Sequence, residues 1–126
     1  MDGSSGQIHG SKNNRGNLTM TRKKIFVVSP LTGKTTQEIE ENIKWAQLIC
    51  RKIILDGDNV FASHLFYPQF LMESNPEERA IGIECGSDWM PYCDEVHVFM
   101  TLRGITTGMK QEIDQAKKLN KIIKYI

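Results

Sequence analysis

Short β-branched and aromatic runs alternate with longer helical patterns along this chain, and the alternation restricts its fold more than any other feature. Four runs have the composition of buried strands: residues 23–30, 59–62, 94–100 and 121–126. Helical segments of ten or more residues lie between them, and crossovers of that length join parallel strands. We therefore expect an α/β fold, a small doubly wound (flavodoxin- or Rossmann-like) three-layer sandwich whose four- to five-stranded sheet is mainly parallel.

Capping residues mark the starts of the three expected helices. Thr35 and Glu38 form a capping box ahead of the first helix, which the pattern extends to Gly57. Pro76 follows Ser-Asn at the start of the second helix, and threonines precede the third within residues 104–119. Each helix is therefore expected to begin directly after a loop that follows a strand.

Length and charge exclude several classes of protein. A chain of 126 residues is long enough for one domain with a single core. Its 16 lysines and arginines balance 15 aspartates and glutamates, so a nucleic-acid polymer is a poor candidate partner. No apolar run approaches the roughly 20 residues that span a bilayer, so we expect no membrane segment.

The composition divides the chain into a tail and one folded domain. Residues 1–20 are rich in Gly, Ser and Asn, so we expect a flexible N-terminal tail followed by a domain over residues 21–126. The three cysteines show no C-x-x-C spacing, and their odd number argues against a disulfide framework. A reducing, cytoplasmic location fits this composition best.

Ligands of a doubly wound sheet bind beyond the carboxyl ends of its strands. That rule selects residues 29–34, 63–64 and 100–109. The first of these loops precedes a helix N-terminus, where a phosphate or a sugar hydroxyl can bind. Its candidate binding residues are Ser29, Thr32, Gly33 and Lys34. An ordinary capped turn with a solvated lysine explains the same residues equally well.

Two histidines lie at or near the expected strands. His64 follows the second strand and is a candidate for substrate contact, although lone histidines are more often structural, and His97 lies within the third strand. Neither belongs to a His, Cys and carboxylate spacing that matches a zinc site. We therefore expect no metal and no other cofactor.

Two carboxylates stand on helix faces that are expected to meet the core. On a helical wheel Glu112 falls inside the apolar stripe that contains Ile113 and Ala116, and Asp88 shares a face with Cys85. Glycosyl transfer uses such a pair of acids. A glutamate at the edge of the stripe and a hydrogen-bonded structural aspartate are the alternatives.

Four segments of the chain resemble the nucleoside 2-deoxyribosyltransferase-like superfamily in order and spacing: KIFVVSPLTG, GDNVFASHL, CDEVHVF and TTGMKQEIDQAKKLNKIIKYI. The resemblance covers residues 24–126 and is closest to a small phage and bacterial branch of uncharacterised proteins. Its most specific element is the pattern G-x-x-x-E-x-x-x-A at Gly108, Glu112 and Ala116.

This resemblance implies an enzyme that cleaves, or transfers the sugar at, the N-glycosidic bond of a deoxynucleoside or deoxynucleoside monophosphate. Carried over by position, Glu112 would be the nucleophile. Asp88 is offset from the helical aspartate of the family, and our own hypothesis makes it an acid or orienting group and Lys34 a phosphate contact. The resemblance also implies a homo-oligomer of two or more chains. The residues that would line the sugar or phosphate site at the start of the last helix are Thr106, Thr107, Gly108 and Met109.

Two other hypotheses stay open. Phe26 replaces the tyrosine that the transferases commonly use to orient the glutamate, and Thr106 stands where an acidic residue is often found. These departures favour a nucleotide-binding or nucleotide-signal-binding module that has lost turnover. A structural or protein-interaction domain is the third hypothesis, and it explains neither the inward glutamate nor the hydroxyl-rich loop.

Overall fold

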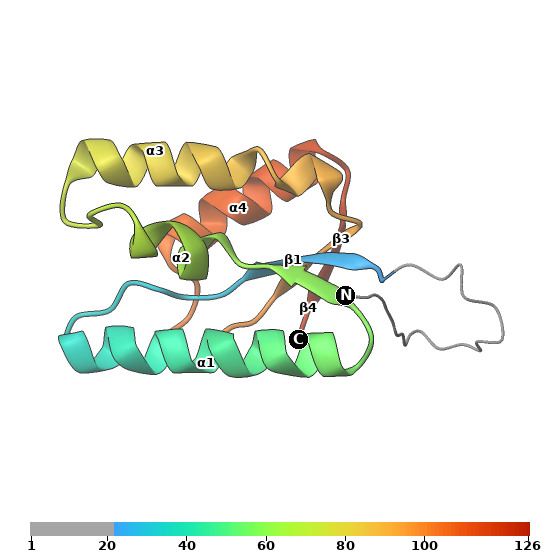
Figure 1. Ribbon diagram of the computed structural model, residues 1–126, viewed down its shortest axis with the longest axis horizontal. Helices are drawn as coiled ribbons and strands as arrows, with labels where there is room; N and C mark the ends of the chain where they lie inside the picture. Colours follow the sequence, from blue (N-terminus) through green and yellow to red (C-terminus); the bar gives the residue numbers. More distant parts are fainter. Residues whose placement is uncertain (1–21) are drawn as a thin grey trace, which may run out of the picture.

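The computed structural model describes residues 22–126, which form three layers with a parallel sheet in the middle (Figure 1). The strands are β1 (Lys24–Val28), β2 (Asn59–Phe61), β3 (Glu95–Val98) and β4 (Ile122–Tyr125). The helices are α1 (Thr36–Leu55), α2 (Ser63–Phe66), α3 (Pro76–Ser87) and α4 (Thr107–Lys118), with short 3-10 helices η1 (Tyr67–Gln69) and η2 (Met90–Tyr92). The predicted tail lies outside the described residues.

The sheet has the order β2-β1-β3-β4, and each neighbouring pair is parallel. In Figure 1, α1 lies below the sheet, whereas α3 and α4 lie above it. Both faces are thus partnered by helices, as parallel sheets require. The expected α/β class, with its doubly wound, three-layer arrangement and a four-stranded parallel sheet, is confirmed.

Strand β1 is the centre of the core. Its side chains alternate between the two faces, with Phe26 and Val28 in the cluster that α4 covers and Ile25 and Val27 in the cluster that α1 covers. All four are completely buried, and each contributes roughly 1.5–3 kcal/mol through burial. The continuous apolar run that predicted a buried strand therefore serves both faces of the sheet.

The start of α1 follows the capping box with one change. Thr35 Oγ1 accepts the backbone N–H of Glu38 at 3.1 Å, as predicted. The Glu38 carboxylate instead accepts the N–H of Lys34 at 2.9 Å, one residue earlier than the pattern implies. The capping residues therefore also close the loop between β1 and α1.

Helix α3 packs through glycines rather than through a large apolar face. Gly82 and Gly86 are its buried residues, whereas Ile81 is exposed. We expected Asp88 to lie on the inner face of this helix, and that expectation is wrong: Asp88 is the exposed C-cap residue of α3. A glycine face adds no hydrophobic signal to a helical wheel, so the wheel selected the wrong side.

The contact between α3 and α2 leaves no room for a side chain at position 86. A Cβ atom on Gly86 would overlap Ser63 Oγ and lie 2.8 Å from Ser63 Cβ. We predict that Gly86→Ala lowers the free energy of unfolding by about 1–3 kcal/mol, because α3 must move away from α2. Urea denaturation measures this change.

Gly108→Ala is the matched control for that substitution. A Cβ atom on Gly108 would lie 4.0 Å from Thr106 Oγ1, an ordinary contact, and alanine favours helix. We expect its stability to equal or slightly exceed that of the native chain. Equal losses of stability in the two variants would contradict the close approach of α3 and α2.

Candidate active site

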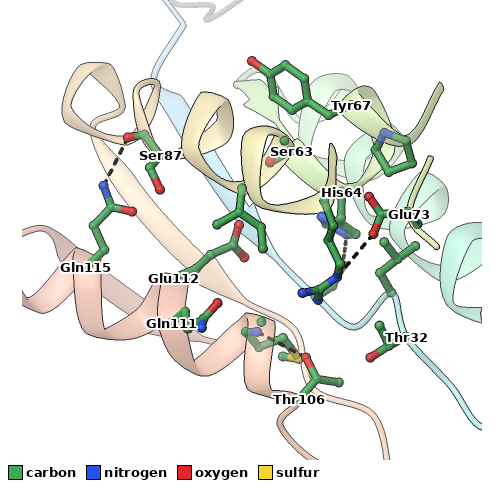
Figure 2. Close-up of a pocket in the computed structure, with 18 residues that line it drawn as sticks. Thr32, Ser63, His64, Tyr67, Glu73, Ser87, Thr106, Gln111, Glu112 and Gln115 are labelled. Carbon is green, nitrogen blue, oxygen red and sulfur yellow. Dashed lines mark hydrogen bonds and ion pairs between the residues drawn. The ribbon is translucent and has the colours of Figure 1, made fainter. Parts of the chain in front are cut away.

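A cavity of about 110 Å³ opens at the carboxyl edge of the sheet, between α3 and α4 and beside the loops that follow β1 and β2 (Figure 2). Parallel-sheet folds bind ligands at this edge. Seven residues that the sequence singled out line the cavity: Ser29, Thr32, His64, Thr106, Gly108, Met109 and Glu112. The fold therefore brings residues from two loops and from helices α2 and α4 to one place.

Helix α4 directs Glu112 into this cavity. Met109, Ile113 and Ala116 on the same helix are buried in the core, which fixes the rotation of the helix about its axis. Thr106 Oγ1 caps the helix by accepting the N–H of Met109 at 3.2 Å. Figure 2 shows the Glu112 side chain pointing from α4 into the cavity. Its position on the apolar side is the one expected from the sequence.

The carboxyl group of Glu112 is half-buried in the cavity and has no hydrogen-bond partner among the described residues. Burial alone raises the pKa of Glu112 from its usual 4.5 to about 8. No charge or hydrogen bond from the described residues offsets this effect. The raised pKa therefore favours the protonated form of Glu112 at neutral pH in the unliganded protein. A titratable group shifted this far inside a cavity is a strong candidate for chemistry.

Ser29 and His64 form a hydrogen-bonded pair in the cavity wall. Ser29 Oγ and His64 Nε2 lie 2.7 Å apart, and burial lowers the pKa of His64 to about 4, so the imidazole is neutral. His64 Nδ1 is buried and has no hydrogen-bond partner among the described residues. An unpartnered buried N–H is costlier than an unpartnered lone pair, so we assign the hydrogen to Nε2. His64 then donates to Ser29, whose own hydroxyl hydrogen is free to reach a ligand.

A side-chain bond joins the two helices at one end of the cavity. Gln115 Nε2 on α4 donates to the backbone oxygen of Ser87 on α3 at 3.1 Å, as Figure 2 shows. Glu112 lies along α4 between this bond and Thr106.

The tyrosines near this region do not orient Glu112. Tyr67 lines the cavity, but its hydroxyl accepts the indole N–H of Trp89 at 2.9 Å, and its ring points away from Glu112 in Figure 2. Tyr92 is 76% exposed and lies outside the cavity lining. Phe26, at the position of the expected orienting tyrosine, is fully buried and packs against Phe61.

Arg79 and Glu73 line the cavity and were not found from the sequence. Arg79 Nε lies 3.6 Å from Glu73 Oε1, and Figure 2 shows Glu73 on the His64 side of the cavity. Arg79 is four residues before Ile83, which also lines the cavity, so both lie on one face of α3. This spacing would have placed Arg79 on the inner side of α3 if the face that contains Gly82 and Gly86 had been taken as the buried one.

Three of the predicted binding residues line a second cavity instead. Gly33, Lys34 and Thr107 lie around a wider space of about 630 Å³ between the N-termini of α1 and α4, which Arg103 also lines. Thr32 and Thr106 line both cavities. The structure therefore separates Lys34 from the cavity that holds Glu112.

Asn42 holds together the two loops that meet between these cavities. Its side chain is buried in α1, where Nδ2 donates to the backbone oxygens of Leu31 and Thr32 at 3.2 and 3.0 Å. Its Oδ1 accepts from Arg103 Nη2 at 3.0 Å. The sequence analysis missed this role, although Asn42 is four residues before Ala46 on the apolar side of the helix. A polar residue at such a position is the available signal.

The remaining expectations concern metals, the second carboxylate Asp88 and membranes. Within residues 22–126, no three His, Cys, Asp or Glu side chains gather closely enough to hold a metal ion. Asp88 lines neither of the two cavities described above. No helix of the described part of the chain is long and apolar enough to cross a membrane.

Comparison with known sequences places the chain in a family. Residues 23–126 match the model of the family described as Domain of unknown function (DUF7768). The chain belongs to this family. None of the curated proteins has a matching sequence.

A solved structure supports the fold. The 2-deoxyribosyltransferase of the psychrotolerant bacterium Bacillus psychrosaccharolyticus is similar over 81% of this chain and 70% of that chain, with a TM-score of 0.60 and 17% sequence identity. A likeness at this identity shows the fold alone. It confirms the relationship to deoxyribosyltransferases at the level of the fold, while the phage and bacterial branch stays a prediction.

The raised pKa of Glu112 makes the stability of the fold depend on pH. Above pH 4.5 the unfolded chain releases this proton, whereas the folded chain retains it up to about pH 8, so Glu112 lowers stability as pH rises through this window. We predict that Glu112→Gln, which mimics the protonated acid, raises the melting temperature at pH 9 and changes it little at pH 4.5. Differential scanning calorimetry over this pH range provides the measurement.

Glu84→Gln is the matched control for the pH dependence, because Glu84 is exposed on α3. We expect its difference from the native chain to vary little with pH. A Glu112→Gln difference that is equally independent of pH would show that the carboxyl group is not desolvated.

Proposed function

We propose that this chain cleaves, or transfers the sugar at, the N-glycosidic bond of a deoxynucleoside or deoxynucleoside monophosphate, with Glu112 as the nucleophile. The observation that carries the proposal is an unpartnered carboxyl group inside a cavity at the ligand-binding edge of a deoxyribosyltransferase-like fold. Retaining glycosyl transfer uses a carboxylate in this role. No metal is needed for the steps below.

The proposed chemistry has two steps. A carboxylate oxygen of Glu112 bonds to C1′ of the sugar while the bond from C1′ to the base breaks, and the base leaves with the bonding electrons and takes a proton from water. Water or a second base then attacks C1′ of the glycosyl ester, loses a proton and restores the Glu112 carboxylate. Water as the acceptor gives a hydrolase, and a base gives a transferase.

The residues around Glu112 serve the same reaction. Ser29, fixed by His64, donates its hydroxyl hydrogen to a sugar or phosphate oxygen in this proposal. Thr32, Thr106 and the backbone at Gly108 complete the polar wall. Asp88 has no role, because its exposed position at the end of α3 keeps it out of the cavity.

The test is free-base release, followed by liquid chromatography, from a panel of deoxynucleosides and their monophosphates in the presence of a second base. We predict that Glu112→Gln lowers the rate by about a thousandfold or more, because the amide cannot form the glycosyl ester. Glu84→Gln is the control, and we expect it to retain native turnover. Unchanged release by Glu112→Gln would remove the nucleophile assignment.

The pH profile provides an independent check. Only the anionic form of Glu112 attacks, and at pH 7 about one molecule in ten of the free protein carries it if the pKa is about 8. We predict that kcat/KM rises about tenfold per pH unit up to this pKa and levels off above it. A profile that is flat between pH 5 and pH 9 would contradict the proposed nucleophile.

A second candidate function is a nucleotide-binding module without turnover. It is favoured because no tyrosine of the described residues orients Glu112: Phe26 is in the core, and the Tyr67 hydroxyl is bonded to Trp89. This function predicts stabilisation by a nucleotide with no base release in the same assay. Sustained release that depends on Glu112 would remove it.

The expected homo-oligomer stays a prediction. Phe66, Phe70 and Met72 are exposed on the segment that connects β2 to α3, where we expected a contact between chains. Exposed apolar side chains of this kind are common at protein interfaces.

A further inference from the structure

Among the described residues that line the Glu112 cavity, Arg79 is the single cation. The other charged residues of that lining are Glu73 and Glu112, so the cavity holds one arginine and two carboxyl groups. The lysine that the sequence suggested as a phosphate contact, Lys34, lines the other cavity. Any anionic part of a ligand beside Glu112 therefore has one side-chain cation available to it, and that cation is an arginine.

The backbone that carries Arg79 is held firmly. Asn75 caps α3 by accepting the N–H groups of Glu77 and Glu78 at 3.0 and 3.1 Å. Glu78 reaches back to accept the N–H of Met72 at 2.8 Å, which ties the preceding loop to the first turn of the helix. Arg79 thus projects from a fixed helical turn into the cavity.

The ion pair that Arg79 makes is, by contrast, easily exchanged. Its Nε lies 3.6 Å from Glu73 Oε1, beyond a short hydrogen bond, and the two side chains are 41% and 37% exposed. An ion pair with this exposure contributes at most about 1 kcal/mol. A phosphate group can accept two parallel hydrogen bonds from a guanidinium, which is a stronger arrangement than this one.

We propose that Arg79 binds a phosphate group of the substrate and so selects phosphate monoesters over unphosphorylated nucleosides, with Glu73 as the counter-ion that Arg79 exchanges for the phosphate. The inference rests on the proposed function for the position of the sugar beside Glu112. It replaces Lys34 as the phosphate contact. It also names the substrate class as a deoxynucleoside monophosphate, because a neutral nucleoside leaves the Arg79–Glu73 pair unchanged.

The kinetic test compares one deoxynucleoside with its 5′-monophosphate. In the native chain we expect kcat/KM to be higher for the monophosphate than for the nucleoside. Arg79→Gln lowers kcat/KM for the monophosphate about 10- to 100-fold and changes kcat/KM for the nucleoside less than about threefold. Arg79→Lys keeps the charge without the planar fork and gives an intermediate loss. Arg51→Gln, an exposed position on α1, is the matched control.

Two kinetic outcomes overturn the proposal. One is an equal loss of kcat/KM for the nucleoside and the monophosphate in both Arg79→Gln and Arg79→Lys, because a structural defect does not distinguish the two substrates. The other is a loss of monophosphate preference in Lys34→Gln but not in Arg79→Gln, which returns the phosphate to the second cavity.

A binding test separates this inference from the proposed function. Inorganic phosphate is titrated by calorimetry at constant ionic strength into Glu112→Gln, with and without a second substitution. We expect Arg79→Gln to weaken phosphate binding at least tenfold, and Glu73→Gln to tighten it severalfold because a competing carboxylate is lost. Weaker binding in Glu73→Gln, or no phosphate binding to Glu112→Gln, overturns the role of Arg79.

The two proposals can fail separately. Arg79-dependent phosphate binding without base release by the native chain would remove the enzyme and leave the phosphate site. Base release that depends on Glu112 but is insensitive to Arg79 would remove the phosphate site and leave the enzyme.

Discussion

The packing of α4 against the sheet is the constraint on which the rest of the site depends. Met109, Ile113 and Ala116 are buried in the core, and a helix that buries these residues must carry Glu112 on the neighbouring face. The folding of its own helix thus places the carboxyl group in a half-buried position, where the loss of hydration raises its pKa to about 8. Core burial supplies the free energy that stabilises the fold. The same free energy keeps Glu112 in an environment that disfavours its charged form.

Most of the fold, and part of the site, follows from the sequence. The order of the strands and of α1, α3 and α4 could be predicted because these helices have capped N-termini and β1 has an uninterrupted apolar run. The short helix α2 has no side-chain cap and was not predicted. Glu112 could be predicted because α4 has an apolar stripe. The inner face of α3 could not, because Gly82 and Gly86 have no side chains and let those of Tyr67 and Ser63 approach the helix, a kind of packing to which hydropathy is insensitive. Arg79 was missed for the same reason, since its role follows from the side on which the glycines lie.

Asn42 shows a second limit of sequence patterns. A single amide on α1 fixes two loops that are far apart in the chain, by donating to the backbone after β1 and accepting from Arg103 after β3. A helical wheel records that the position is inward, but it does not contain the backbone oxygens that a buried amide needs. Such long-range partners exist only in the folded chain, so polar anchors are harder to predict than apolar ones.

The glycine contact between α2 and α3 joins the two walls of the cavity into one unit. Ser63 of α2 contacts Gly86 of α3 and directly precedes His64. Arg79 lies on the same helix as Gly86. The spacing between these walls is consequently set by the backbone of Gly86 and the short side chain of Ser63, neither of which has a long chain of atoms that can move aside. A ligand that is too wide for this gap cannot be accommodated by side-chain adjustment at that contact. The width of the cavity therefore depends on how α2 and α3 pack together, and a change of width requires a change in that packing.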